Sequence, residues 1–325
     1  METGPQRPSF VGVTRFSVAM VGNPSWRMTR KLTAGDEDRY LSALWSPERM
    51  APRYELFSRL CAPQLQAMAG HHDYHHVVLY SPGLPEPWLG LLRATVQEHP
   101  VLQLVAVEGP GLPSVSSLVH KLIRGRRVDS GPVVAFRVDD DDLLALNFLE
   151  KLTPYANYGD RGRAVNLSRG FTCVWDESTL TVYDIRPVFE RFSGRGQAFI
   201  GWYDTESGVL EGLPVRHEPH DKVDRFRPVI HDARHPSFLW THHLHQDSHE
   251  GYSKLTPAER ISRAMAGIPP GSPDELAQAL RLFPTLHGRV EARDPVPAPA
   301  VPAPALSTRV RRWMRTQRRR LARWT

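Results

Sequence analysis

The sequence predicts an α/β protein with a mostly parallel central sheet and flanking helices, followed by a smaller β region. Strand-like and helix-like stretches alternate over about the first 160 residues, which is the pattern of parallel strands joined by crossover helices. Beyond that point, strand-like stretches follow one another directly. The 325 residues, 41% of them hydrophobic and 23% charged, suffice for one large globular domain or two ordinary ones.

The predicted strands of the first half are short apolar runs. They lie at residues 10–20, 75–80, 102–107 and 133–138. Between and after them, apolar residues recur three and four positions apart, which predicts helices with one buried face. These helices are expected at residues 53–68, 85–99, 114–124 and 143–156, with a kink at Pro63 in the first.

The second half has a different pattern. The stretches "AVNLSRGFTCVWD" and "STLTVYDIRP" predict two consecutive strands, which suits a hairpin, and "QAFIGWYD" predicts another. A His-rich stretch ending in "HPSFLWTHHLHQDSHEGY" follows, and "SPDELAQALRLF" predicts the last helix. We therefore divide the folded part into residues 1–160 and 161–293, as two halves of one domain. A Pro/Ala-rich linker at 294–305 should be extended.

The basic charge of the chain is concentrated after this linker, in residues 306–325. The sequence has 41 Lys and Arg against 35 Asp and Glu, and eight arginines fall in its last 17 positions. Without those eight, 33 basic residues face 35 acidic ones, which argues against a nucleic-acid-binding core. The tail's apolar residues, among them Trp313 and Trp324, share one helical face. This predicts either an amphipathic helix on an anionic membrane or a disordered basic tail.

Sequence features that the chain lacks bear on its cellular compartment and on the redox state of its cysteines. No apolar run reaches membrane-spanning length, and the first residues do not have the charged-then-apolar layout of a signal peptide. Cys61 and Cys173 are too few for a disulfide framework or a thiolate metal site. We expect a cytoplasmic protein, peripheral at the inner face of the cell membrane if the tail binds lipid.

Four consecutive aspartates, Asp139 to Asp142, directly follow the apolar run "VVAFRV". Neighbouring carboxylates repel one another and raise one another's pKa unless a cation joins them. In open parallel sheets, ligands bind outside the carboxyl ends of the strands. Carboxylates presented there suit a hard divalent ion, Mg²⁺ or Mn²⁺, which in turn holds phosphate oxygens. The alternative is that one aspartate caps the next helix and the others are solvated, which explains one aspartate of the four.

With these aspartates, the sequence resembles the rhamnosyltransferase family of GT-A-fold enzymes, related to the large inverting family 2. The aspartates resemble the metal-binding Asp-x-Asp motif of GT-A glycosyltransferases. The resemblance also rests on "TRFSV", "RYELFSRLCAPQL", "VVLYSPGLPEPW", "FRVDDDDLLALNFLEKL" and "FLWTHHLHQ" occurring in this order, and it covers roughly residues 10 to 255. It implies a nucleotide-sugar-binding first half and an acceptor-side second half.

Two departures from the family pattern are visible. Many such enzymes carry an aspartate at the end of the second strand, near the nucleotide base, where this chain has Ser81. The stretch "LHQDS" also differs from the family's usual sequence around its late histidine. The nucleotide base and the acceptor side are therefore left open.

Roles are carried over from the family onto the aspartates. Asp141 is expected to contact the metal, supported by Asp142. Asp139 is expected to reach the ribose or a metal-bound water. Asp140 is placed with it on the nucleotide side, although solvent or a helix cap explains Asp140 most readily. Arg15, which ends the first predicted strand, is expected to contact donor phosphate or to form an ordinary ion pair.

Two further roles come from the second half. Of the histidines in "WTHHLHQDSH", His245 has the spacing that best fits the metal-completing histidine of the family. An inverting enzyme also needs a general base, usually a carboxylate, near the acceptor hydroxyl. We select Asp204 in "GWYDTESG", because aromatic neighbours that could stack on a sugar flank it. Exposed histidines and surface carboxylates are the ordinary alternative for both residues.

The function implied by the resemblance is metal-dependent inverting transfer of a sugar, such as rhamnose, from a nucleotide-sugar donor to a cell-surface glycan or glycolipid. Two alternatives stay open. A sugar nucleotidyltransferase shares the sheet and the divalent ion, but its Gly-rich basic loop is not matched by "SVAMVGNPSWRMTRKL". A catalytically silent peripheral membrane protein would explain the tail but not the aspartates.

Overall fold

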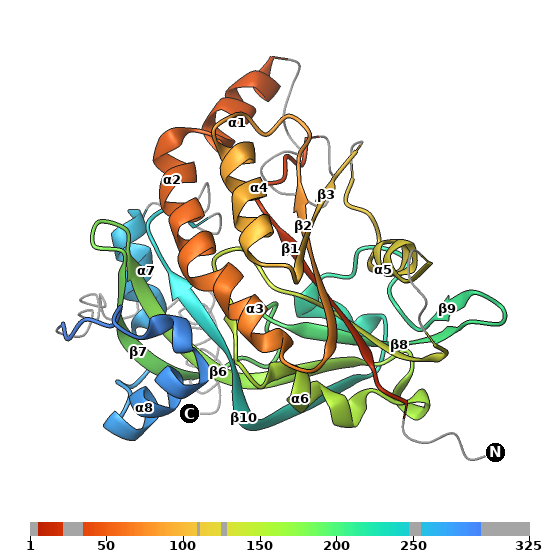
Figure 1. Ribbon diagram of the computed structural model, residues 1–325. Helices are drawn as coiled ribbons and strands as arrows, with labels where there is room; N and C mark the ends of the chain where they lie inside the picture. The colour runs from red at the N-terminus through yellow and green to blue at the C-terminus, as the bar shows by residue number, and fades with distance from the viewer. Residues whose placement is uncertain (1–5, 22–34, 109–110, 125–128, 247–254, 294–325) are drawn as a thin grey trace, which may run out of the picture.

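The computed structural model describes residues 6–21, 35–108, 111–124, 129–246 and 255–293 (Figure 1). The predicted linker and basic tail lie outside this part of the chain. The strands are β1 (Ser9–Arg15), β2 (Asp73–Tyr80), β3 (Leu102–Ala106), β4 (Gly131–Arg137), β5 (Leu143–Leu144), β6 (Ala164–Asp176), β7 (Thr181–Phe189), β8 (Gln197–Asp204), β9 (Val209–Glu211) and β10 (Val229–His242). The α-helices are α1 (Asp36–Leu44), α2 (Pro47–Leu56), α3 (Ala62–Ala69), α4 (Trp88–Glu98), α5 (Val115–Arg124), α6 (Phe148–Leu152), α7 (Pro257–Met265) and α8 (Pro273–Leu282).

All of these strands belong to one sheet, in the order β3-β2-β1-β4-β8-β6-β10-β5, with β7 paired to β6 and β9 to β8. The first four strands of this order are parallel to one another. Strand β8 runs antiparallel to β4, whereas β6 and β10 are parallel to each other. The α/β prediction is confirmed, and strands from both sides of residue 160 share the same sheet.

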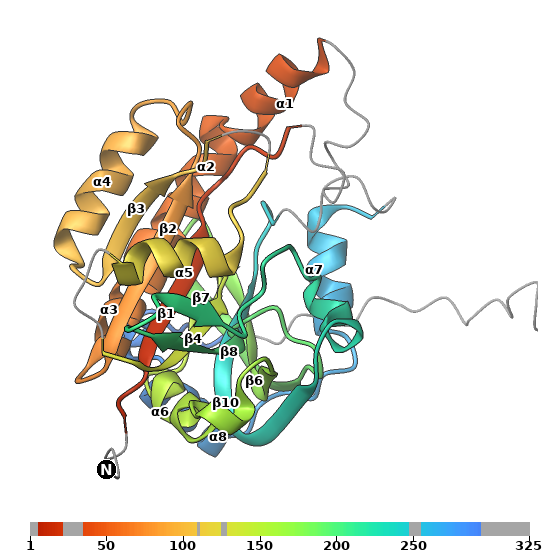
Figure 2. The same cartoon turned by 90° about the vertical axis from the view of Figure 1, so that its right-hand side faces the viewer.

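The two faces of the sheet are covered by different helices (Figures 1 and 2). Alternate residues of β1 point to opposite faces, as the two-residue period of a strand requires. Phe10 packs in the larger core with residues of α2, α3 and α4. Val11 and Val13 pack in smaller clusters on the α5 side. Burial on both faces explains why the strands of the first half read as continuous apolar runs.

The first long helical segment is continuous from Pro47 to Ala69 but changes its winding. A π-helical turn, Phe57–Cys61, lies between α2 and α3 and ends two residues before Pro63. Proline lacks a backbone N–H and cannot continue regular α-helical bonding, so a wider turn at this point is expected. Such turns are frequent near functional sites, and the α2 part of this segment faces the pocket described below.

One predicted helix is wrong. Residues 143–156 form β5, the short helix α6 and a 3₁₀ turn at Thr153–Tyr155 instead of a single helix. Leu143 and Leu144 pair antiparallel with Leu239 and Phe238 of β10, so tertiary strand pairing overrides their helical spacing. The His-rich stretch also contains a 14-residue strand, β10, that the sequence did not predict.

A buried histidine joins β1 and β2 in the core. The Nδ1 of His76 lies 2.6 Å from the Tyr74 hydroxyl, and its Nε2 lies 2.8 Å from the Thr14 hydroxyl. Burial lowers the pKa of His76 to about 3. Gly12 makes room for this ring, because a Cβ at position 12 would lie 2.2 Å from Nδ1 of His76. The neutral imidazole therefore acts as a satisfied core group.

Among the described helices, none combines the length and hydropathy that crossing a membrane requires.

Candidate active site

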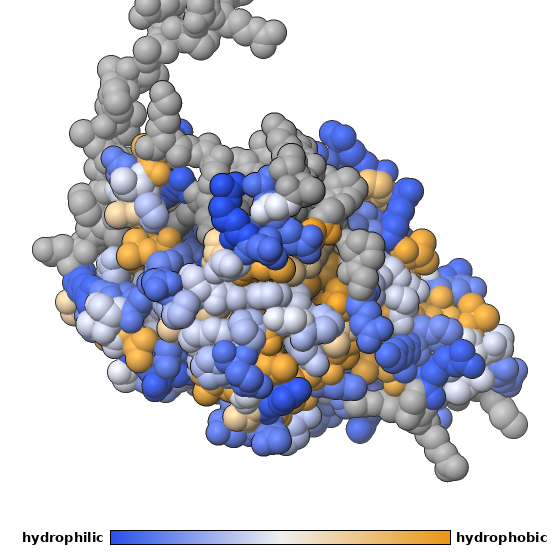
Figure 3. All heavy atoms as spheres, turned by 90° about the horizontal axis from the view of Figure 1, so that it is seen from above, coloured by the Kyte–Doolittle hydropathy of each residue, from blue (hydrophilic) through white to orange (hydrophobic). Residues whose placement is uncertain are grey.

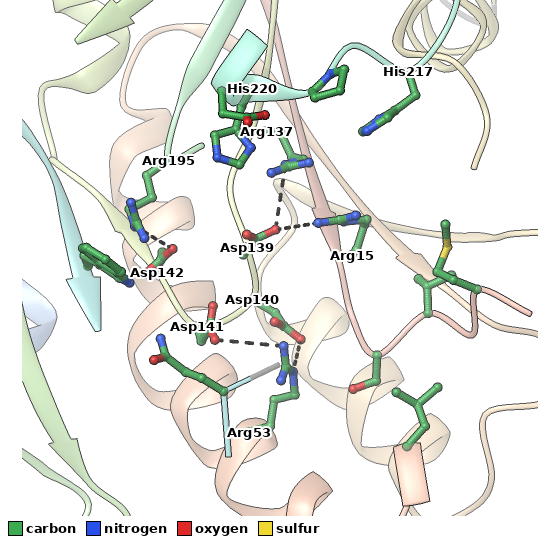
Figure 4. Close-up of a pocket in the computed structure, with 18 of the residues that line it drawn as sticks. Arg15, Arg53, Arg137, Asp139, Asp140, Asp141, Asp142, Arg195, His217 and His220 are labelled. Atoms are coloured by element: carbon green, nitrogen blue, oxygen red, sulfur yellow. Dashed lines mark hydrogen bonds and ion pairs between the residues drawn. The ribbon is translucent and has the colours of Figure 1, made fainter. Parts of the chain in front are cut away.

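A cavity of about 460 Å³ lies where β1 and β4 end, which we call the carboxyl edge of the sheet (Figure 4). Figure 3 views the molecule from above, where hydrophilic side chains predominate and hydrophobic ones form smaller groups. The cavity wall combines carboxylates, guanidinium groups and imidazoles with a few apolar side chains. It is lined by Arg15, Ser17, Val18, Met20, Tyr40, Ala43, Leu44, Arg53, Arg137, Asp139, Asp140, Asp141, Asp142, Arg195, His217, Pro219, His220, Asp221, Trp240 and Gln246.

Asp139 is held between two arginines at the ends of neighbouring parallel strands. Its Oδ1 lies 3.1 Å from Nη2 of Arg15, on β1, and 3.8 Å from Nε of Arg137, on β4. The strand register explains this meeting, because Arg137 pairs with Val13, two residues before Arg15. Burial opposes ionisation, but Arg137 and Arg15 outweigh it and hold the pKa of Asp139 well below its usual value. Asp139 is therefore a stable carboxylate, and its side chain is 38% exposed.

Asp140 is buried against an arginine of helix α2. Nε of Arg53 donates to Oδ2 of Asp140 at 2.8 Å, and both side chains are at most 5% exposed. Nη2 of Arg53 also lies 4.0 Å from Oδ2 of Asp141. One turn earlier on the same helix, Nη1 of Arg49 donates to the Ser17 hydroxyl at 3.0 Å. Helix α2 thus fixes both the aspartate turn and the segment after β1.

Asp141 begins a chain of contacts that leads away from the cavity. Its Oδ2 lies 3.1 Å from Nε2 of His243, whose Nδ1 lies 3.4 Å from Oε1 of Glu177. The other oxygen of Glu177 lies 3.2 Å from Nε2 of His245. Burial lowers the pKa of His243, but its hydrogen bonds to Asp141 and Glu177 outweigh burial and raise it above the ordinary value. His243, and not His245, is the histidine that contacts the aspartates.

Both carboxylate oxygens of Asp142 are engaged. Oδ1 accepts a hydrogen bond from the Thr241 backbone N–H at 3.1 Å, and Oδ2 lies 3.1 Å from Nε of Arg195. The Arg195 guanidinium carbon lies 3.8 Å from the centre of the Trp240 ring. Burial raises the pKa of Asp142; Arg195 opposes this rise, and the carboxylates of Asp141 and Asp139 add to it. Asp142 thus joins the turn after β4 to β10 and to the β7–β8 connection.

Two histidines complete the wall opposite the aspartates, next to Arg137 (Figure 4). Burial and the positive charge of Arg137 lower the pKa of both His217 and His220. At neutral pH they present uncharged imidazoles that can donate or accept hydrogen bonds. This wall is therefore polar without adding positive charge.

The structure brings together five of the seven predicted site residues. Arg15 and the four aspartates line the cavity. His245 lies behind His243, in contact with Glu177. Asp204 is not brought to the cavity: β8 begins beside Arg137 and ends beside Gly131, so Asp204 lies at the opposite edge of the sheet. There Asp204 accepts a hydrogen bond from the Glu206 N–H at 2.8 Å and stabilises the turn before β9.

Sequence reasoning found Arg15 but missed the other cationic residues of the site. Arg53, Arg137 and Arg195 each contact one of the aspartates, and His243 contacts Asp141. His243 was among the histidines considered, but its place at the end of an unpredicted strand was not visible. Arg137 stood out only as the end of a strand and Arg195 only as a neighbour of glycines, and Arg53, inside helix α2, carried no signal. The apparent excess of negative charge is thus compensated by arginines from distant parts of the chain.

The donor set suits a divalent ion that is shared with a ligand. Carboxylate oxygens are the ligands that Mg²⁺ and Mn²⁺ prefer, and Mg²⁺ is commonly held by one or two carboxylates together with substrate phosphates. Within the described part of the chain, no group of three or more His, Cys, Asp or Glu side chains is arranged to hold a metal by itself. Asp139 and Asp141 fit a site of the shared type, because both line the cavity.

Fold and cavity together define an α/β protein with a charged ligand site at the carboxyl edge of a parallel sheet. Residues 9–254 match the model of a family described as putative rhamnosyl transferase, and the chain belongs to this family. It is accordingly a glycosyltransferase, as the resemblance predicted.

Other comparisons add little. No curated protein sequence matches the chain. Among solved structures, the chain is similar to a 4-diphosphocytidyl-2C-methyl-D-erythritol synthase from Anaerococcus prevotii DSM 20548. The identity is 9% and the TM-score 0.26, over 70% of this chain and 88% of that one.

Proposed function

We propose that this glycosyltransferase moves a sugar, rhamnose by the family description, from a nucleotide-sugar donor to a glycan or glycolipid acceptor, with inversion at the anomeric carbon. One observation carries the proposal: the acidic turn after β4 and the arginines of β1, α2, β4 and the β7–β8 connection line the same cavity. Guanidinium groups bind phosphate oxygens with matched geometry, and carboxylates suit ribose hydroxyls or a phosphate-bound cation.

Charge balance supports a metal ion in this reaction. Four arginines and five aspartates line the cavity, and burial raises the pKa of Asp142 to about 8, so the fixed charge at neutral pH is close to zero before a ligand enters. A nucleoside diphosphate then adds negative charge. Asp139 and Asp141 would hold a Mg²⁺ or Mn²⁺ ion together with the phosphates. As a Lewis acid, this ion would neutralise the charge of the departing diphosphate. Arg15 and Arg137 keep Asp139 ionised and point toward the same space (Figure 4).

The base that deprotonates the acceptor must come from the cavity, which Asp204 does not reach. Asp221 lines the cavity on the 3₁₀ turn His220–Arg225. Each aspartate of the acidic turn lies within 4.0 Å of an arginine, whereas none of the ion pairs between described residues involves Asp221. We assign the base to Asp221, because a carboxylate near the acceptor hydroxyl can accept its proton as the new bond forms.

The test is a donor screen. Purified full-length protein is incubated with a panel of nucleotide sugars, including a nucleotide-linked rhamnose, with Mg²⁺ or Mn²⁺ and with a chelator. Release of nucleoside diphosphate from one donor, abolished by the chelator and by Asp141→Ala, is the expected result. Pyrophosphate release from a nucleoside triphosphate and sugar phosphate would instead identify a nucleotidyltransferase. A protein that turns over no nucleotide sugar contradicts the proposal.

Membrane association is a separate part of the proposal and rests on the sequence of residues 306–325. Clustered arginines with tryptophans favour anionic lipid surfaces, where each basic residue contributes about 1 kcal/mol at low salt. Full-length protein should co-sediment with anionic vesicles and be released by high salt. Equal binding to neutral vesicles, or none at low salt, contradicts this part alone.

A further inference from the structure

Arg195 reaches the acidic turn from the connection between β7 and β8. Two glycines, one on each side, allow its backbone to pack closely against neighbouring groups. Gly196 has a φ of +74°, and its N–H donates to the Arg137 carbonyl at 2.8 Å. A Cβ at position 196 would lie 2.6 Å from the Phe148 ring. A Cβ at position 194 would lie 3.3 Å from Nη2 of Arg137. The connection is therefore pressed against the end of β4, and Arg195 between the glycines enters the cavity.

The side chain of Arg195 is also held in place before any ligand binds. Trp240 stacks on one face of the guanidinium at 3.8 Å, and Asp142 contacts Nε at 3.1 Å. The side chain is 14% exposed. Among the described residues, Nη1 and Nη2 donate no hydrogen bond. A planar guanidinium held by one face and one edge can present its remaining N–H groups to a ligand.

These contacts are more than Asp142 needs for charge compensation. To compensate a buried carboxylate, a partner of opposite charge is enough. An aromatic ring stacked on that partner, and glycines that let its backbone approach closely, are not needed for compensation. Preorganised donors of this kind are the feature by which enzymes stabilise charge that develops in a transition state, because they need no reorganisation during the reaction. The geometry thus favours a role toward the ligand.

We propose that Arg195 is a catalytic residue that donates hydrogen bonds to the diphosphate of the donor and stabilises its charge as it leaves; this rests on the proposed function. In the transfer, the bond between the anomeric carbon and the β-phosphate oxygen breaks, and that oxygen keeps the electron pair. A bond from the acceptor oxygen to the anomeric carbon forms, and the acceptor proton passes to the base. The negative charge on the leaving oxygen grows toward the guanidinium N–H groups.

The experiment separates catalysis from charge compensation through the Arg195–Asp142 pair. Arg195→Met is compared with the double variant Arg195→Met/Asp142→Asn, which removes both charges. For catalysis, we expect kcat to fall about 10²–10³-fold in both variants, with a smaller change in the donor KM. A kcat of the double variant restored to near the wild-type value would overturn the proposal, because compensation of Asp142 would then be the whole role of Arg195.

Arg195→Lys serves if Arg195→Met does not fold. It keeps the positive charge beside Asp142 but loses the planar fork, so kcat should still fall at least about tenfold. A wild-type kcat in Arg195→Lys overturns the proposal. The matched control is Arg191→Ala, on the same connection but outside the cavity lining, which should keep wild-type kcat and KM. A wild-type protein that turns over no nucleotide sugar overturns the proposed function and this inference together.

Discussion

The two sides of the cavity are formed by different kinds of structural element. On the first-half side, Arg15, Arg53 and Arg137 project from strands and a helix onto the aspartates, and strands β1 to β4 are parallel to one another. On the second-half side, Arg195 lies on the β7–β8 connection, His217 lies on the connection after β9, and His220 begins a 3₁₀ turn. Rigid elements suit the invariant part of a donor, whereas loops suit a variable partner. On this basis we propose that the first half, together with Arg195, binds the diphosphate, and that the other loops of the second half meet the acceptor.

The largest expected effect is on the first-half side. Asp139→Asn keeps the shape of the side chain but removes the charge that pairs with Arg15 and Arg137. Transfer should fall about 10²–10³-fold, because the arginines lose the partner that orients them and the metal loses a donor. Steady-state release of nucleoside diphosphate measures this. Asp204→Asn, at the far edge of the sheet, should transfer like wild type; an equal loss in both variants would contradict the placement of the site.

The next largest effect concerns stability. Arg53→Ala leaves Asp140 buried without its 2.8 Å partner, and such uncompensated charges cost about 3–5 kcal/mol. Arg59→Ala on the following turn removes only an exposed pair with Glu55, worth less than about 1 kcal/mol. Urea unfolding of the two variants measures the loss in the free energy of unfolding for each. Similar losses would show that the buried pair is not a main support of the first half.

A pH dependence follows from His76. Its pKa is about 3 when folded, against about 6.5 in the unfolded chain, so the unfolded state binds more protons below pH 6.5. Its contribution to stability is complete above pH 6.5 and is lost as the pH falls toward 3, at up to about 1.4 kcal/mol per pH unit. Unfolding at pH 7, 6 and 5 should show this slope, and it should be shallower in His76→Gln. Equal slopes would contradict a neutral core histidine.

The smallest expected effect is on the second-half packing. A Cβ at Gly170 on β6 would lie 2.6 Å from both the ring and the carbonyl oxygen of Phe238 on β10. Gly170→Ala should therefore cost about 1–3 kcal/mol through forced displacement of β10. Gly83→Ala, where the nearest Trp45 atom is 3.4 Å away, serves as a control with little loss. Equal melting temperatures for both variants would show that β10 shifts without cost.

Much of the first half was predictable, and the reasons are physical. Parallel strands buried on both faces give continuous apolar runs, and a polar cluster at the end of such a run marks the carboxyl edge. The strand before Asp139 and the charged cavity at its end followed from these rules. The helix predicted at residues 143–156 failed because two leucines pair with a distant strand, a contact that no local pattern contains.

The second half was harder to predict, because strand direction and β-bulges leave no signal in the local sequence pattern. The strand over "QAFIGWYD" was predicted, but not that it runs antiparallel to β4, and this direction removes Asp204 from the site. Strand β10 has register shifts around Pro236, which disrupt the alternation that would have revealed it and placed His243. The three missed arginines are among 36 in the chain, and only the fold selects them.

The central claim is that the acidic turn and its arginines together bind a nucleoside diphosphate with a divalent ion. Calorimetric titration of nucleoside diphosphates, in the presence of Mn²⁺, into wild type and Asp141→Ala tests it most directly. We predict saturable binding by wild type that weakens at least about tenfold in the variant or when Mn²⁺ is withheld. Equal affinities for the two proteins, with and without Mn²⁺, would contradict it.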